Sequence, residues 1–312
     1  MDIFSVILPF LMYGLMSAVF ARFTGINMSM YLLMIFLYMG AKPGETIVAM
    51  LLFNTFTYFT VYSQQHVMTM KTFIIFPGVK FIIPLVITLG LALLSPFLGI
   101  VFFVVVFLLE IFAKIYTSMN KKIRPTKQQL VQMSAVASVC VLVGVFVIQF
   151  IPEQYYYLFA GAAILLLTVL MWIAGDRRRL EPQWDGILYA STFITGLVGI
   201  DATDWLMSMR RANQSMLARC YPIVINAASI VGLILAYGMY RYFSVGALFA
   251  TIGASIGIRF FGVPEYSERG VFSRVTIALA IVAALIFLIS QPQPTGILAA
   301  PVSNESGGLL HF

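Results

Sequence analysis

Charged residues are scarce in this chain of 312 residues, because Asp, Glu, Lys and Arg together make up only 10% of it. A soluble domain carries about 25% charged and about 45–50% apolar residues, whereas 61% of this chain is hydrophobic and its mean hydropathy is +0.97. A water-facing fold of this size could not bury so much apolar surface. The composition therefore excludes an ordinary soluble globule and predicts a polytopic α-helical membrane protein. The apolar runs are continuous and lack the alternation of barrel strands, which excludes a transmembrane barrel.

Cysteine and histidine are also nearly missing. The two cysteines, Cys140 and Cys220, lie in apolar runs, which favours packing as small hydrophobic residues over a disulfide. The two histidines form no cluster with metal-ligand spacing, and the chain contains no glycine-rich phosphate loop, Walker motif or nucleophile elbow. We therefore expect neither an enzyme nor a cofactor or metal.

Long apolar runs, in contrast, are abundant, and a membrane crossing takes about 20 residues. Two apolar regions, 3–40 and 186–211, are each interrupted by a polar patch that contains glycine, at 22–27 and at 199–204. The uninterrupted runs cover roughly 45–62, 72–94, 97–117, 129–150, 155–174, 220–237, 243–262 and 271–290.

The two interruptions resemble each other in sequence. Gly25-Ile26-Asn27-Met28-Ser29-Met30-Tyr31-Leu32 aligns with Gly199-Ile200-Asp201-Ala202-Thr203-Asp204-Trp205-Leu206, and each stretch is followed by a helix with a central asparagine, Asn54 or Asn226. This pattern predicts an internal duplication. We expect a first transmembrane repeat at 1–117, a linker with two transmembrane helices at 118–185, a second repeat at 186–290 and a disordered tail at 291–312.

The net charge of +7 fits a membrane protein with basic cytoplasmic loops, and no pattern points to nucleic acid. Basic residues gather in the loops 118–128, 175–184 and 210–219. If each interrupted region turns back as a hairpin, these loops face the cytoplasm and both termini lie outside a cell (inner) membrane. Each repeat then has one hairpin and three crossings, so the second repeat is inverted relative to the first.

A helix is interrupted at membrane depth only where protein or a water-filled cavity satisfies the freed backbone groups. Paired interruptions in two inverted halves are typical of the binding site of a secondary transporter. The alternative is that each interruption is a surface turn between two separate crossings. The candidate substrate-binding residues at and beside the interruptions are Arg22, Thr24, Gly25, Asn27, Asn54, Gly199, Thr203 and Asn226.

Charges inside apolar regions sharpen this hypothesis, because they are usually paired or functional. Arg22 either faces an anionic substrate or pairs with Asp201 or Asp204. The two aspartates either form a proton or cation coupling site or act as ordinary helix caps. Elsewhere, the stripe Gly246, Ala250, Gly253 and Gly257 predicts close packing of one helix against another.

The pattern resembles the sulfite exporter TauE/SafE family of anion transporters over roughly 10–117 and 190–290. The residues that carry the resemblance are Thr24-Gly25-Ile26-Asn27 and Val198-Gly199-Ile200-Asp201 at the glycine-rich turns, Gly40-Ala41-Lys42-Pro43 at the following loop, and Gly253-Ala254-Ser255-Ile256-Gly257 in a later helix. The resemblance implies transport of small organic or sulfur-containing anions, such as sulfite, sulfonates or carboxylates.

Two hypotheses about function follow from the sequence. The first is a secondary transporter that moves a small anion by alternating access, with a coupling proton or cation at Asp201 or Asp204. The second is a non-transporting membrane subunit or receptor that binds a protein partner. Membrane lipid is the expected environment in both, and the choice between a monomer and a homo-oligomer stays open.

Overall fold

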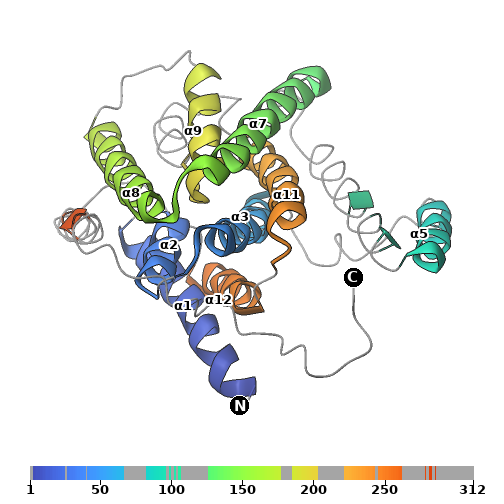
Figure 1. Cartoon of the computed structure of the whole chain (residues 1–312), viewed down its shortest axis with the longest axis horizontal. Coiled ribbons are helices and arrows are strands. Elements are labelled where there is room, and N and C mark those ends of the chain that lie inside the picture. Colours follow the sequence, from blue (N-terminus) through green and yellow to red (C-terminus); the bar gives the residue numbers. More distant parts are fainter. Residues whose placement is uncertain are drawn as a thin grey trace. The chain divides into compact units, whose positions relative to one another are not determined.

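The structure is a computed structural model that describes residues 3–24, 27–39, 41–66, 82–95, 98–99, 102, 105–106, 126–176, 185–202, 221–242, 245–261, 278, 281–282 and 285. Every regular element among these residues is a helix, and no strand occurs in them (Figure 1). The predicted all-α class is therefore confirmed for the described part of the chain. The predicted run at 271–290 and the predicted tail at 291–312 lie almost wholly outside it.

Within the described residues, the helices agree closely with the predicted runs, although only 82–94 of the run at 72–94 and almost none of the run at 97–117 is described. Two of them, spanning Lys127–Phe150 and Ile223–Tyr240 in continuous helical residues, are long and apolar enough to cross a membrane. The full set is α1 (Ile3–Thr24), α2 (Met28–Tyr38), α3 (Pro43–His66), α5 (Ile82–Leu94), α7 (Lys127–Val147), the 3-10 turn η2 (Ile148–Phe150), α8 (Glu153–Asp176), α9 (Asp185–Val198), α11 (Tyr221–Tyr240) and α12 (Val245–Phe261).

The start of α7 shows how local sequence sets a helix boundary. The hydroxyl of Thr126 accepts a hydrogen bond from the backbone N–H of Gln129 at 3.3 Å, and the Gln129 side chain accepts one from the N–H of Thr126 at 3.3 Å. This capping box satisfies two donors that a helix start otherwise leaves open. The long apolar run that follows therefore begins as a helix at Lys127.

The chain divides into two units. The larger unit comprises 1–61 and 125–300, and the smaller comprises 62–124 and 301–312, where α5 is the main described helix. Helices α7 and α8 of the predicted linker fall in the same unit as helices of both predicted repeats. All contacts discussed below lie within the larger unit.

Helix α1 packs along α12, which joins the first predicted repeat to the second. A Cβ atom on Gly253 of α12 would lie 2.0 Å from the carbonyl oxygen of Leu11, and one on Gly14 of α1 would lie 1.7 Å from that of Ala250. Only glycine allows the two backbones to approach so closely. The predicted packing role of the small-residue stripe at 246–257 is thereby confirmed.

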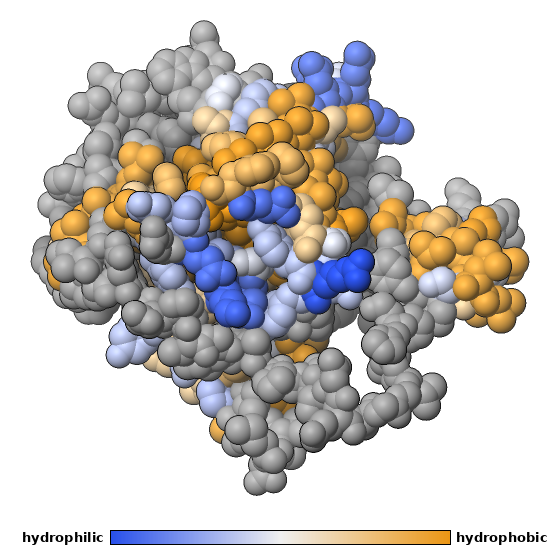
Figure 2. Space-filling view, viewed as in Figure 1, coloured by the Kyte–Doolittle hydropathy of each residue, from blue (hydrophilic) through white to orange (hydrophobic). Residues whose placement is uncertain are grey.

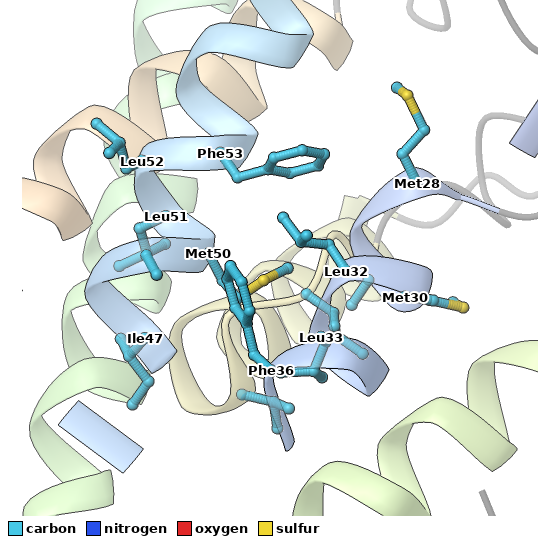
Figure 3. Close-up of a cluster of buried hydrophobic side chains, with 14 of the residues drawn as sticks. Met28, Met30, Leu32, Leu33, Phe36, Ile47, Met50, Leu51, Leu52 and Phe53 are labelled. Carbon is cyan, nitrogen blue, oxygen red and sulfur yellow. The ribbon is translucent and has the colours of Figure 1, made fainter. Parts of the chain in front are cut away.

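Helices α2 and α3 form the centre of the hydrophobic core (Figure 3). Leu32, Leu33 and Phe36 of α2 face Met50 and Phe53 of α3, and all five side chains are fully buried. Around this centre, α9 and α11 both pack along α7. The core thus surrounds α3 with helices that come from distant parts of the sequence.

Helices α3 and α11 run antiparallel. Three contacts fix their relative direction: Gly44 lies against Tyr240, Leu51 lies near Gly232, and Thr55 is hydrogen-bonded to Asn226. The α3 residue number rises as the α11 number falls. Asn54 and Asn226, the matching asparagines of the two predicted repeats, therefore both lie near one end of this contact.

Candidate functional site

The first predicted interruption separates α1 from α2. Helix α1 ends at Thr24, and α2 begins at Met28 with Asn27 as its N-cap in an extended conformation. The Asn27 Oδ1 atom accepts a hydrogen bond from the N–H of Ser29 at 2.7 Å. Helix α2 turns back along α1, with ring centroids of Phe20 and Tyr31 5.7 Å apart. This interruption is stabilised by its own capping residue.

The second predicted interruption ends α9 at Val198. The next residue, Gly199, has φ +88, a left-handed conformation that residues with a side chain adopt only at a cost. A Cβ atom there would also lie 2.7 Å from the Cβ of Met50 on α3. The N–H of Gly199 donates to the carbonyl of Thr195 at 2.8 Å, and the N–H of Ala202 donates to the Thr195 hydroxyl at 3.1 Å.

Two other helices supply donors to the carbonyl groups of this second interruption. The hydroxyl of Tyr156 on α8 donates to the Val198 carbonyl at 3.0 Å. The Nδ2 atom of Asn54 on α3 donates to the Gly199 carbonyl at 2.8 Å. Both donor side chains are buried. The two bonds therefore satisfy carbonyl groups that water does not reach in these apolar surroundings.

The two interruptions meet inside the larger unit. Asn27 Nδ2 donates a hydrogen bond to Oδ2 of Asp201, and the backbone N–H of Asp201 donates to the Ser29 hydroxyl at 2.9 Å. Asp201 is fully buried. Residues 174 positions apart in the sequence thus form one polar centre within an otherwise apolar core.

Asn226 extends this polar centre to α11. Its Nδ2 atom donates to the backbone carbonyl of Thr55, the residue after Asn54. Its Oδ1 atom is buried and has no hydrogen-bond partner, and the same holds for the hydroxyl of Ser229 one helical turn later. Consecutive residues of α3 therefore connect the second interruption to α11.

The structure places the other candidates less completely. Arg22 lies half-buried in the last turn of α1, and Thr24 is the last residue of that helix. Gly25, Thr203 and Asp204 lie outside the described residues, so their predicted roles stay predictions. Among the described residues, no group of three or more His, Cys, Asp or Glu could hold a metal ion.

Several residues of the polar centre were not predicted from the sequence. Ser29 and Thr203 occupy matching places in the two repeats, so the alignment offered a signal for Ser29. Tyr156 lies in the predicted linker, and nothing in its sequence neighbourhood points to α9. The same is true of Thr195 and Ser229, whose hydroxyls are ordinary in apolar helices.

The chain matches no protein-family model, no curated protein and no solved structure. The resemblance to the sulfite exporter TauE/SafE family therefore stays a prediction. What the structure adds is a polar centre within an apolar helical core. It has the carboxylate of Asp201, three amide side chains and four hydroxyls, from Asn27, Asn54, Asn226, Ser29, Tyr156, Thr195 and Ser229.

Proposed function

We infer that this chain is a multi-pass protein of a cell (inner) membrane and a secondary transporter of small organic or sulfur-containing anions. The observation that carries the proposal is the hydrogen bond between Asn27 and Asp201, which joins the two interrupted stretches inside an apolar core. Interrupted helices that meet in pairs are the usual construction of a transporter's central site. In lipid, such backbone is tolerated only where it is buried or lines a cavity.

The apolar exterior supports the membrane part of this proposal. Figure 2 shows a broad band of hydrophobic residues on the described surface in view, beside a patch of hydrophilic residues nearer its centre. Large hydrophobic residues are exposed along α7, one of the two helices long enough to span a bilayer. They are Val131, Val136, Val139, Val143, Phe146 and, in the adjoining 3-10 turn, Phe150. Membrane lipid is the partner that such a surface fits.

Two contacts support an inverted duplication. Asn27 and Asp201 hold the same place in the aligned repeats, and they bond to each other. Asn54 and Asn226 also hold matching places, and they lie near each other where α3 and α11 run antiparallel. Equivalent residues meet in this way beside a two-fold axis that relates inverted repeats.

Asp201 is the proposed coupling residue. A buried carboxylate repels an anion and is itself costly to keep charged. A proton or cation bound at Asp201 neutralises the carboxylate. This lowers both the repulsion of the anion and the cost of burying the negative charge. Alternating access would then depend on the coupled loading of Asp201 and the substrate site, with Arg22 as the candidate positive charge for the anion.

The alternative is a non-transporting membrane subunit, and one observation favours it. Each backbone group described above at the second interruption has a partner within the protein, supplied by Asn54, Tyr156, Ser29 and Thr195. A turn satisfied in this way needs no solvent-filled site. Such a protein would bind a partner and carry no anion.

Counterflow in liposomes tests the proposal. Purified protein is assayed with labelled sulfite, thiosulfate, a sulfonate and lactate, for wild type, Asp201→Asn and the control Thr57→Val. Thr57 is a buried threonine whose hydroxyl bonds only carbonyls of its own helix. We expect exchange of at least one anion by wild type and Thr57→Val.

The Asp201→Asn variant separates coupling from binding. We expect it to keep anion exchange but to lose uptake driven by a proton or cation gradient, because the amide still accepts from Asn27 but binds no proton or cation charge. Folded protein that exchanges none of these anions would favour the alternative. Gradient-driven uptake that persists in Asp201→Asn would remove Asp201 from the mechanism.

A further inference from the structure

Two buried polar atoms on α11 are left without a partner. The Asn226 Oδ1 atom and the Ser229 hydroxyl are both enclosed, and neither makes a hydrogen bond. Native proteins rarely bury such atoms unsatisfied, so each one calls for an explanation such as an ion, a water or a ligand. Residues three apart on a helix lie on one face, so both atoms belong to the same face of α11.

The neighbouring glycine shows where this face of α11 points. Gly232 follows Ser229 by three residues, and a Cβ atom on it would lie 2.5 Å from Val141 of α7 and 3.4 Å from Leu51 of α3. Asn226 precedes Ser229 by three residues on the same face of α11, and it is bonded to the carbonyl of Thr55 on α3. The unpartnered atoms therefore lie in the interior between α3, α7 and α11.

The chemistry of the two atoms restricts the ligand. The Asn226 amide is fixed by its bond from Nδ2 to Thr55, so the atom that it leaves unpartnered is an acceptor oxygen. An acceptor oxygen repels an anion and attracts a cation. Neutral amide, hydroxyl and backbone carbonyl oxygens are ligands for hard cations, and Na⁺ in transporters is held by such groups.

The surroundings favour a single positive charge. A divalent ion usually takes carboxylate ligands, whereas the two unpartnered atoms on this face are neutral. The Asp201 carboxylate is linked to this face through α3. Asn54 bonds the carbonyl of Gly199, two residues before Asp201, and the next residue of α3, Thr55, bonds Asn226. One carboxylate nearby balances one monovalent cation.

We propose that Asn226 and Ser229 form a Na⁺ site between α3 and α11, completed by neutral oxygens of α3. The site rests on the proposed transport function, in which it holds a Na⁺ ion in addition to the proton or cation that loads at Asp201. Na⁺ bound there holds α11 against α3 beside the two interruptions. Loading the site thereby favours the arrangement in which Asp201 and the anion site are assembled.

Thermal unfolding of the purified protein in detergent tests the site without any transport measurement. The chloride salts of Na⁺, K⁺ and choline are compared at equal ionic strength, for wild type, Ser229→Ala and Asn226→Leu. The control is Ser17→Ala, which removes an equally buried serine hydroxyl that already bonds the Tyr13 carbonyl at 2.8 Å. Direct binding of radioactive Na⁺ accompanies the unfolding measurement.

We expect Na⁺ alone to raise the unfolding temperature of wild type and Ser17→Ala in a saturable way, because a ligand that binds only the folded state stabilises it. Ser229→Ala should weaken the apparent Na⁺ affinity by at least about tenfold, a change of about 1.4 kcal/mol. Without Na⁺, Ser229→Ala should be at least as stable as wild type, since it removes an unsatisfied hydroxyl. Ser229→Ala thus keeps the test informative if Asn226→Leu does not fold.

Equal unfolding temperatures in Na⁺, K⁺ and choline would overturn the site and indicate a buried water instead. A Na⁺ response that persists unchanged in Ser229→Ala would overturn it as well. Na⁺ binding that Ser229→Ala weakens, in a protein that exchanges no anion, would support the site while contradicting the transport proposal. Anion exchange without any Na⁺ binding would do the reverse.

Discussion

The two interrupted stretches both have backbone groups that lie outside regular helical hydrogen bonding, and they satisfy these groups with different partners. At the first, Asn27 caps α2 from its own end, through a bond to Ser29 two residues later. At the second, Gly199 takes a left-handed conformation, and its carbonyl depends on Asn54 from another helix. The first is therefore a local feature of the sequence, whereas the second exists only once α3 and α8 are in place.

This difference has a consequence for function. A stretch whose hydrogen bonds come from several helices changes its bonding whenever those helices move relative to one another. The second interruption carries Asp201, so any rearrangement there reaches the buried carboxylate directly. If the proposed transport moves these helices, the bonding of the second interruption would change, whereas the cap within the first interruption would be kept.

The largest expected effect comes from replacing Gly199 by alanine. The side chain would pay the cost of the left-handed conformation, about 1–2 kcal/mol, and would crowd Met50 for about 1–3 kcal/mol more. We expect the free energy of unfolding to fall by about 2–5 kcal/mol, measured by denaturant titration in detergent. Gly238→Ala is the control, because nothing lies within 4 Å of a Cβ atom there, and it should be neutral or slightly stabilising.

The next largest effect is expected for Asn54→Leu. The leucine fills a similar volume but leaves the buried Gly199 carbonyl without a donor, which costs about 1–3 kcal/mol. The same denaturant titration measures it, with Thr57→Val as the control on the same helix. Equal stability of the two variants would show that the second interruption does not depend on α3.

The smallest effects are expected at the first interruption. Asn27→Ser keeps a good capping oxygen and loses only the bond to Asp201, so unfolding should become easier by about 0.5–1.5 kcal/mol. Asn27→Ala loses the cap as well and should cost about 1 kcal/mol more. Amide hydrogen exchange in α2 should rise in Asn27→Ala but stay near wild type in Asn27→Ser. A rise of the same size in both variants would contradict a locally capped stretch.

Much of the helical architecture could be predicted from the sequence because it depends on short-range patterns. The apolar runs at 45–62, 129–150 and 243–262 correspond to α3, α7 with its 3-10 turn, and α12 within a few residues. The interruptions were visible as glycine and polar residues within apolar sequence. The small-residue stripe of α12 likewise indicated a close contact, although it did not name α1 as the partner.

The candidate site was less predictable, because its bonds join residues far apart in the chain. Asn54 and Asn226 were singled out by their matching places in the repeats, but their partners, Gly199 and Thr55, were not. Tyr156 was missed entirely, since a tyrosine in an apolar helix gives no indication of which carbonyl it will bind. The role of Arg22 and the coupling role of Asp201 stay predictions.

Apolar composition by itself determined that this chain forms helices, and glycine and polar residues determined where two of them stop. Helical hydrogen bonds join residues four apart, so nearby sequence is enough to specify them. Which helices touch is a different matter, because burial of apolar surface is not directional and many pairings would bury similar areas. Only the folded arrangement decided that Asn27 meets Asp201, that Asn54 reaches Gly199, and that Asn226 and Ser229 face an interior position with oxygens unpaired.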